Sequence, residues 1–224
     1  MTTSTDPKTS GRCSVAVLIS GSGSNLQSLI DSAEEGGYSI CAVVSNKADA
    51  LGLTRAKKAG IPTALLSHLA FATREDFDLA LMDIIDQYEP DLVVLAGFMR
   101  ILSAAFVTHY AGRLLNIHPS LLPDFAGVNT HQRALDAKVT RHGASVHFVT
   151  EELDGGPPIV QGRISMGDSD EAELASRVQQ EIEHKIYPLA VDWFLNGRLQ
   201  FRDNHAYLDR ELIPLSGIQW TNDD

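Results

Sequence analysis

The chain alternates short apolar runs with amphipathic helical stretches, and this alternation constrains its fold more than any other feature. The apolar runs, rich in Val, Ile and Leu, lie at residues 14–20, 39–45, 62–67, 91–98 and 113–118. Apolar side chains at helical spacing separate several of them, at residues 25–37, 51–60 and 74–90. Repeated strand–helix units build a parallel sheet covered on both faces. We therefore predict an α/β, Rossmann-like fold with a mostly parallel central sheet of about seven strands and helices on both faces.

The pattern changes after Pro123. Residues 143–153 alternate like a strand, and residues 157–166 form a further apolar run. Pro157-Pro158 open that run, and proline cannot donate to a sheet ladder, so the run is predicted to be an edge strand. Residues 170–197 are long enough for one helix to Tyr187 and a second piece after Pro188. Residues 198–208 are predicted to form a terminal hairpin.

No internal repeat, low-complexity tract or shift in composition divides the chain. Residues 1–12 are polar and are predicted to be a flexible leader without the apolar core of a secretory signal. We predict a single domain over residues 13–210, followed by a tail at 211–224. Trp220 in this tail is open to two interpretations, as a cover for a partner subunit or as a loosely ordered residue.

Charge and cysteine content exclude several classes of protein. The net charge of −11 and the pI of about 5.1 argue against broad binding to nucleic acid or to an anionic membrane, which needs a basic field. No apolar run reaches the length of a membrane span. Cys13 and Cys41 form no disulfide framework, which indicates a reducing compartment. We expect a cytoplasmic protein that is a monomer or a weak homodimer.

A glycine-rich loop follows the first predicted strand. Gly21, Gly23, Ser24 and Asn25 lie where the next helix begins, and the unpaired N–H groups of a helix N-terminus bind anions. A dinucleotide fingerprint needs a third glycine, and Leu26 occupies its place. The loop therefore favours a single phosphate over a pyrophosphate. A tight turn with a polar cap explains the same residues equally well.

A second polar group lies at the end of the fifth predicted strand. Asn116 and His118 are two residues apart and point to the same side of that strand, and Pro119 ends it. Asp154 follows a later strand and is flanked by glycines. Ligands of open α/β sheets bind at the carboxyl ends of strands. If the two loops meet, one site holds an amide, an imidazole and a carboxylate.

This trio suits acyl transfer to an amine. Attack by the amine creates a tetrahedral centre with a negative oxygen, which Asn116 and a protonated His118 are placed to stabilise. Asp154 would favour the protonated imidazole, and His118 would donate a proton as the centre collapses. Metal catalysis is the alternative for a site with histidine. The histidines are scattered without a metal-ligand motif, so we expect no metal.

Five motifs in order resemble the phosphoribosylglycinamide formyltransferase family. They are LISGSGSNLQSLI, SNKADALGLTRAKKAGI, AGFMRILSAAFV, LLNIHPSLLP and HGASVHFVTEELDGGPPIVQ. The resemblance implies the formyltransferase fold and a place in de novo purine (IMP) biosynthesis. It implies transfer of a formyl group from 10-formyltetrahydrofolate to the amine of N1-(5-phospho-D-ribosyl)glycinamide. The products would be formylglycinamide ribonucleotide and tetrahydrofolate.

The resemblance also implies roles for individual residues. The catalytic residues would be Asn116, His118 and Asp154. The ribonucleotide, in the N-terminal half, would be bound by Gly23, Ser24, Asn25 and Glu183, with Glu181 as the rival for the role of Glu183. The folate, in the C-terminal half, would contact Arg74, Met99, Arg100, Ile101, Leu102, Asn116, Thr150, Glu151, Glu152, Leu153 and Asp154. The alternative interpretation of Met99, Ile101 and Leu102 is that they are ordinary core residues, which contact no ligand.

Three stretches depart from the pattern expected for the family. Asp124 and Ala126 replace a basic or aromatic-proline stretch, so the contacts of the 124–130 loop are in doubt. Pro158 stands where an aliphatic residue is expected. The stretch before Tyr187 is one residue longer than the expected spacing, and this is why Glu181 rivals Glu183.

Three alternatives share parts of the pattern. A formyltetrahydrofolate deformylase would use water as the acceptor and would carry a regulatory domain before the first strand. A methionyl-tRNA formyltransferase would carry a C-terminal tRNA-binding domain and a basic surface. A non-catalytic folate- or nucleotide-binding module would keep the pocket without the catalytic trio.

Overall fold

The computed structural model describes residues 13–221, so the predicted leader at 1–12 lies outside the described residues. The strands are β1 (Cys13–Ile19), β2 (Tyr38–Ser45), β3 (Thr63–Leu65), β4 (Leu92–Leu95), β5 (Leu114–His118), β6 (Arg141–Phe148), β7 (Pro158–Ser165), β8 (Leu199–Arg202), β9 (His205–Leu208), β10 (Glu211–Leu212) and β11 (Ile218–Trp220). The helices are α1 (Ser24–Ser32), α2 (Leu51–Lys58), η1 (His68–Ala70), α3 (Arg74–Asp86), α4 (Ala104–His109), α5 (Thr130–Asp136), α6 (Glu171–Arg177), η2 (Val178–Glu183) and α7 (His184–Leu195).

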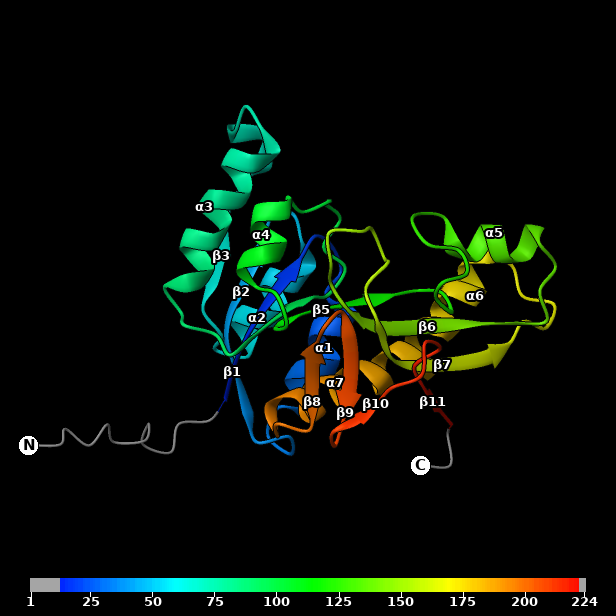
Figure 1. Cartoon of the computed structure of the whole chain (residues 1–224). Helices are drawn as coiled ribbons and strands as arrows, with labels where there is room; N and C mark the ends of the chain where they lie inside the picture. The colour runs from blue at the N-terminus through cyan, green and yellow to red at the C-terminus, as the bar shows by residue number, and fades with distance from the viewer. Residues whose placement is uncertain (1–12, 222–224) are drawn as a thin grey trace, which may run out of the picture.

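The central sheet has eight strands in the order β11-β7-β6-β5-β4-β1-β2-β3 (Figure 1). Strands β3, β2, β1, β4 and β5 run parallel, whereas β6 is antiparallel to both of its neighbours. The predicted α/β architecture with a mostly parallel sheet is confirmed. Strands β8, β9 and β10 form a separate antiparallel sheet, which contains the predicted hairpin.

Both faces of the sheet are buried, as the unbroken apolar runs predict. On β1, Val15, Val17 and Ile19 belong to the core shared with α1, α2 and α7. Ala16 and Leu18 face the opposite way, into the core shared with α3 and α4. Figure 1 shows α3 and α4 lying together at one end of the sheet. This double cover leaves the strand ends as the place where polar side chains meet.

Two predictions about the sheet edge are wrong. β7 is an interior strand, because it pairs with β6 on one side and with β11 on the other. Its opening residue, Pro158, lies opposite His147 at an irregularity in the register, where a missing N–H donor is tolerated. The predicted tail contributes Ile218–Trp220 to the sheet, so the fold extends beyond residue 210 and Trp220 packs against the core.

The late helical segment also differs from expectation. It is continuous through Pro188, which lies inside α7. The irregularity comes earlier, where Val178–Glu183 form a π-helix between α6 and α7. The change from wide to ordinary helical pairing at that junction tolerates a residue without an N–H donor. The short helix α4 was not expected; Ser103 caps it by accepting a hydrogen bond from the amide of Phe106.

Among the described helices, none is long and apolar enough to cross a membrane.

Tyr187 ties α7 to the two central strands that carry the site. Its buried hydroxyl lies 3.0 Å from the carbonyl oxygen of Leu95 on β4 and 3.2 Å from that of Leu115 on β5. Burial raises the pKa of this phenol well above its ordinary value, so it remains a donor at any physiological pH. It therefore fixes the distance between α7 and the strands.

We expect Tyr187→Phe to lower the free energy of unfolding by about 1–3 kcal/mol, because it removes a buried donor and keeps the ring. Urea denaturation followed by circular dichroism measures this change. Tyr207→Phe, on the peripheral sheet, is the matched control and should change stability by less than about 0.5 kcal/mol. Equal stability of the Tyr187 variant and the wild type would contradict the assigned role.

Candidate active site

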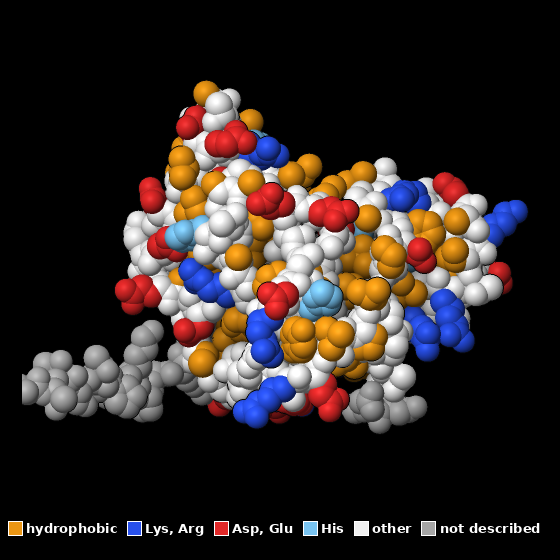
Figure 2. Space-filling view, viewed as in Figure 1, with side chains coloured by type: hydrophobic (Ala, Val, Ile, Leu, Met, Phe, Trp, Pro, Cys, Tyr) orange, Lys and Arg blue, Asp and Glu red, His pale blue; other side chains and the backbone are white. Residues whose placement is uncertain are grey.

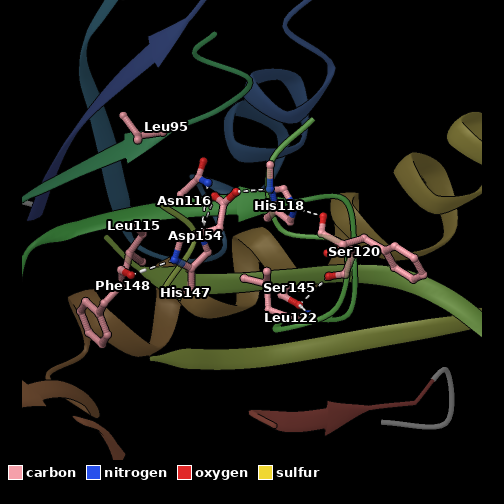
Figure 3. Close-up of polar contacts among 12 residues, drawn as sticks. Leu95, Leu115, Asn116, His118, Ser120, Leu122, Ser145, His147, Phe148 and Asp154 are labelled. Atoms are coloured by element: carbon pink, nitrogen blue, oxygen red, sulfur yellow. Dashed lines mark hydrogen bonds and ion pairs between the residues drawn. The ribbon is translucent and has the colours of Figure 1, made fainter. Parts of the chain in front are cut away.

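The predicted catalytic residues come together at the carboxyl end of β5 (Figure 3). The Nδ1 atom of His118 lies 3.4 Å from Oδ2 of Asp154, and both side chains are more than nine-tenths buried. Asn116 lies two residues earlier on the same strand, and Nε2 of His147, 3.8 Å from Oδ1 of Asp154, lies 3.1 Å from the Asn116 amide nitrogen. The loop after β6 thus meets the end of β5, as required for a single site.

His147 joins this group and was not expected from the sequence. It lies directly opposite Asn116 in the antiparallel pairing of β5 with β6. Burial lowers the pKa of His147 to about 4, so the ring is neutral at physiological pH. Its Nδ1–H donates to the carbonyl of Phe148 at 2.8 Å, which leaves Nε2 as an acceptor. The amide of Asn116 donates to that atom at 3.1 Å, so His147 fixes the orientation of Asn116.

The loop after β5 contacts both members of the imidazole–carboxylate pair. Nε2–H of His118 donates to the carbonyl of Phe125 at 3.2 Å, and the amide of Gly127 donates to Oδ2 of Asp154 at 2.8 Å. Both ring nitrogens of His118 therefore face oxygen acceptors. The doubtful 124–130 loop thus borders the catalytic group directly.

Ser145 on β6 anchors the chain where it leaves β5. Its hydroxyl donates to the carbonyl of Ser120 at 2.6 Å and accepts the amide of Leu122 at 3.0 Å, as Figure 3 shows. Gln161 on β7 donates to the carbonyl of Leu122 at 2.7 Å. These buried bonds hold the segment after His118 against the sheet.

Backbone geometry places Asp154. The residue has a φ of 52°, in the left-handed region that Asn and Asp tolerate better than other non-glycine residues. A side chain at Gly156 would overlap the carbonyl oxygen of Phe148, so glycine is needed where the loop returns to the sheet. The amide of Phe148 donates to the carbonyl of Pro157 at 3.2 Å and closes the loop.

A cavity of about 420 Å³ adjoins the catalytic group. Ile117 and Pro119, the neighbours of His118 in the chain, line its wall. The glycine-rich loop and the late helical segment line the rest, and the lining residues include Gly23, Ser24, Asn25, Lys47, Met99, His131, Gln179 and Glu183. The predicted phosphate loop and the two chain neighbours of His118 therefore border one continuous space.

The glycine-rich loop is open to a ligand. Gly23, the N-cap of α1, has a φ of 69°, and no side chain caps the helix. A side chain on Gly23 would overlap the backbone of Gly52 on α2, so glycine allows the two segments to approach closely. The first amides of α1 are free of side-chain caps, and the positive end of the helix dipole faces the cavity.

Glu183, and not Glu181, reaches the cavity. Asn25 donates from Nδ2 to a carboxylate oxygen of Glu183 at 2.6 Å, and both residues are buried. Oδ1 of Asn25 is buried without a hydrogen-bond partner within the described chain. Glu181 is exposed and pairs with Arg177. Gln179, four residues before Glu183 and on the same face of this helical segment, also lines the cavity.

The residues predicted to contact folate lie in different surroundings, and only some of them are exposed near one another. Met99 and Ile101 are 71% and 58% exposed, and Leu153 projects from the Asp154 loop with 56% exposure. Leu102 instead packs against the core between the sheet and α3. Arg74 forms an exposed ion pair with its neighbour Glu75. Thr150, Glu151 and Glu152 lie with Leu153 in the loop between β6 and β7.

A pair of histidines lies between the cavity and the core. Nδ1 of His131 lies 3.1 Å from Nε2 of His142. Burial, with the neighbouring imidazoles, lowers the pKa of His142 to about 4, and burial lowers the pKa of His131. Both rings are therefore uncharged at neutral pH. Over residues 13–221, no group of three His, Cys, Asp or Glu side chains is arranged to hold a metal ion.

Two further surface features frame the site. A larger groove of about 760 Å³ between α1, α7 and β11 shares Ser24 with the cavity, but no neighbour of His118 in the chain lines it. Acidic and basic side chains are interspersed on the face drawn in Figure 2. With a net charge of −11, an anionic ligand must be bound by local groups and not by the overall field.

Comparison with known proteins matches residues 13–191 to the formyl transferase family model. The chain is 55% identical to the phosphoribosylglycinamide formyltransferase of Escherichia coli K12 over 207 residues, which cover 91% of this chain and 97% of that protein. It is 46% identical over 192 residues to the human trifunctional purine biosynthetic protein adenosine-3, covering 85% of this chain and 19% of the human protein.

Solved structures agree with this relationship. The phosphoribosylglycinamide formyltransferase of Coxiella burnetii superposes with a TM-score of 0.90 at 48% identity, covering 94% of this chain and all of that chain. Glycinamide ribonucleotide transformylase 1 of Symbiobacterium toebii superposes with a TM-score of 0.84 at 40% identity, covering 88% of this chain and 94% of that chain.

The buried carboxyl of Glu183 should make stability depend on pH. Burial raises its pKa, although the bond from Asn25 opposes the shift. The carboxyl of Glu183 therefore holds its proton more tightly in the folded than in the unfolded state. As the pH rises above 4.5, the ordinary pKa of a glutamate, Glu183 makes the folded protein progressively less stable.

We therefore expect Glu183→Gln to raise the melting temperature at pH 7 to 8 by a few degrees, about the effect of 1 kcal/mol, with the difference shrinking near pH 4. Differential scanning calorimetry across this range measures it. Glu181→Gln, at the exposed position, is the control and should show no such trend. A gain independent of pH would contradict the explanation.

Proposed function

The chain belongs to the phosphoribosylglycinamide formyltransferase family, and from this premise we propose how its residues bind and join the two substrates. In de novo purine biosynthesis these enzymes transfer a formyl group from a formyl folate. We propose that the donor is 10-formyltetrahydrofolate and that the acceptor is the amine of glycinamide ribonucleotide. The observation that carries this proposal is the cavity whose wall includes both neighbours of His118.

The cavity suits a ribonucleotide with one phosphate. We assign the phosphate to the uncapped amides around Gly23 and Ser24, with the ammonium group of Lys47 on the same wall. The carboxylate of Glu183 would repel a phosphate, so we assign it to ribose hydroxyls. The unpartnered Oδ1 of Asn25 is a ready acceptor for one of these hydroxyls. This places the glycinamide end of the substrate toward His118.

The folate is assigned to the opposite side of the catalytic group. The exposed side chains of Met99, Ile101 and Leu153 offer an apolar wall for a flat pterin ring. The Thr150–Asp154 loop supplies polar groups beside it, and Arg100 lies within the predicted set. The assignment of Arg74 depends on movement of its side chain away from Glu75.

The chemistry follows from the donors around the formyl carbon. The amine attacks this carbon, and its oxygen becomes negative. We propose that this oxygen takes the place of the Phe125 carbonyl as the acceptor from Nε2–H of His118. The second N–H of the Asn116 amide, which His147 leaves free, is the other donor.

Collapse of the tetrahedral centre breaks the bond to the folate nitrogen. The departing nitrogen needs a proton, which His118 donates, and the amine releases one as the new bond forms. Asp154, at 3.4 Å, stabilises the charged imidazole throughout. We propose no metal in this reaction.

Two alternatives keep part of this picture. A deformylase would deliver water to the same formyl group, and a non-catalytic module would bind folate or nucleotide without turnover. The ribonucleotide cavity favours transfer to an amine over transfer to water, and the Asn116–His118–Asp154 arrangement favours a catalyst over a binding module. The proposed partners are small molecules without nucleic acid or membrane, in a cytoplasmic monomer or weak homodimer.

Incubation of the purified protein with glycinamide ribonucleotide and 10-formyltetrahydrofolate tests the proposed function. We expect formylation of the amine at a rate that depends on both substrates, with one tetrahydrofolate formed for each product. Release of formate that does not require the ribonucleotide would instead indicate a deformylase. Binding of either ligand without turnover would indicate a non-catalytic module.

We expect His118→Ala to lower kcat by about 10³-fold or more, because it removes both an oxyanion donor and the proton donor. Binding of tetrahydrofolate and of the ribonucleotide, measured by calorimetry, should survive. His109→Ala, whose imidazole pairs with Asp86 at the surface, is the matched control and should retain normal turnover. Turnover within tenfold of the wild type in the His118 variant would exclude the mechanism.

We expect Asp154→Asn to lower kcat by about 10²-fold and to change the pH profile of kcat, because the neutral amide no longer stabilises a charged imidazole. Steady-state kinetics between about pH 5.5 and 9, a range that includes the titration of imidazoles, measures both effects. A lower kcat with an unchanged profile would assign Asp154 a purely structural role.

A further inference from the structure

Side chains from outside the segment hold Met99–Leu102 at both ends. At its start, the amide of Met99 donates to Oγ of Ser20 at 2.8 Å. At its end, the amide of Ser103 donates to a carboxylate oxygen of the buried Asp78 on α3. This anchoring explains how Met99 and Ile101 can project outward from a segment without helix or strand structure.

The anchor at Ser20 lies next to the glycine-rich loop, whereas the anchor at Asp78 lies on α3. Ser20 is 4% exposed and separates β1 from the glycine-rich loop. Its amide donates to the carbonyl of Gly97 at 3.1 Å, so that its backbone and its hydroxyl hold two sides of the turn between Gly97 and Met99. The hydroxyl in turn donates to Oδ1 of Asn46, a buried residue beyond β2, at 2.6 Å.

The glycine-rich loop begins at the next residue. The carbonyl of Gly21 accepts the amide of Gly52 at 3.1 Å, and the carbonyl of Ser22 accepts Nε of Arg55 at 2.9 Å. The loop is thus held by α2 on one side and by Ser20 on the other. Any displacement of Ser20 moves both the loop assigned to the phosphate and the segment assigned to the folate.

We propose that Ser20, supported by Asn46, is a positioning residue that holds the ribonucleotide loop and the folate segment in one fixed arrangement. This inference rests on the proposed function, because it concerns the placement of the same two substrates. Met99 shows the connection directly, since its amide donates to Ser20 and the residue is among those that line the ribonucleotide cavity. The amine and the formyl carbon meet only if these two walls keep their separation, and small misplacements slow such reactions greatly.

The contrast with Asp78 gives the test. Ser20→Ala removes the hydroxyl that joins the residue before the glycine-rich loop to the start of the folate segment, whereas Asp78→Ala releases only the far end of that segment. Ser32→Ala, at the last turn of α1, is the control for loss of a serine hydroxyl, since that hydroxyl bonds to Tyr38 and to the carbonyl of Leu29 and not to the site. Steady-state kinetics, corrected for folded enzyme by active-site titration, gives kcat and both KM values for each variant.

For Ser20→Ala we expect kcat to fall by about tenfold or more and both KM values to rise by about threefold. For Asp78→Ala we expect the folate KM to rise by about fivefold without a rise in the ribonucleotide KM. Ser32→Ala should leave all three constants within about twofold of the wild type. Ser20→Thr restores a hydroxyl and should recover most of the lost kcat. If Ser20→Ala does not fold, Ser20→Cys, with a weak thiol donor and acceptor, should show the same pattern in smaller measure.

A merely structural role for Ser20 would lower the melting temperature and the yield of folded enzyme while leaving kcat and both KM values unchanged. That result, or an equal rise of both KM values in Asp78→Ala, would overturn the inference while the wild type still formylates the ribonucleotide. A wild type that formylates nothing would overturn the proposed function first, so the two failures are distinguishable.

Discussion

The antiparallel pairing of β6 with β5 is the constraint on which the site depends. Strands β1 to β5 run parallel to one another, whereas β6 runs the opposite way and begins beside the carboxyl end of β5, with Ser145 opposite His118. Because β6 runs backward, His147 lies opposite Asn116 and the chain then turns at Phe148. The loop that follows returns Asp154 to His118. The reversed strand thus gathers polar groups from β5, from β6 and from the loop that follows β6.

Burial determines how these groups behave. His147 is held neutral by its surroundings and acts as an acceptor that orients an amide, while His118 faces oxygen acceptors with both nitrogens. The same residue type thus serves two purposes within one site, and its partners decide which. Glu183 follows the same logic in the neighbouring cavity, where a buried carboxylate weakens the fold and provides a strong acceptor for a ligand.

The two proposed substrate regions meet around the ends of β1, β4 and β5. Ser20 and Tyr187 illustrate this from opposite sides. Ser20 accepts a hydrogen bond from Met99 in the turn after β4. Tyr187, on α7, donates to the carbonyls of Leu95 and Leu115. A site that joins two substrates needs such rigidity, since the reacting atoms come from ligands bound to different walls.

The sequence by itself determined the α/β architecture and the pair at the end of β5. Unbroken apolar runs can only be strands buried on both faces, and Asn116 and His118 at strand spacing can only point to one side. The sequence did not reveal that β7 lies inside the sheet or that Ile218–Trp220 complete it, because short strands at a chain end carry too little periodicity. Nor did it reveal the role of His147, whose partner is set by strand register, or the choice of Glu183 over Glu181. That choice depends on which face of the late helical segment packs against Asn25 and the cavity, and only the tertiary structure decides this packing.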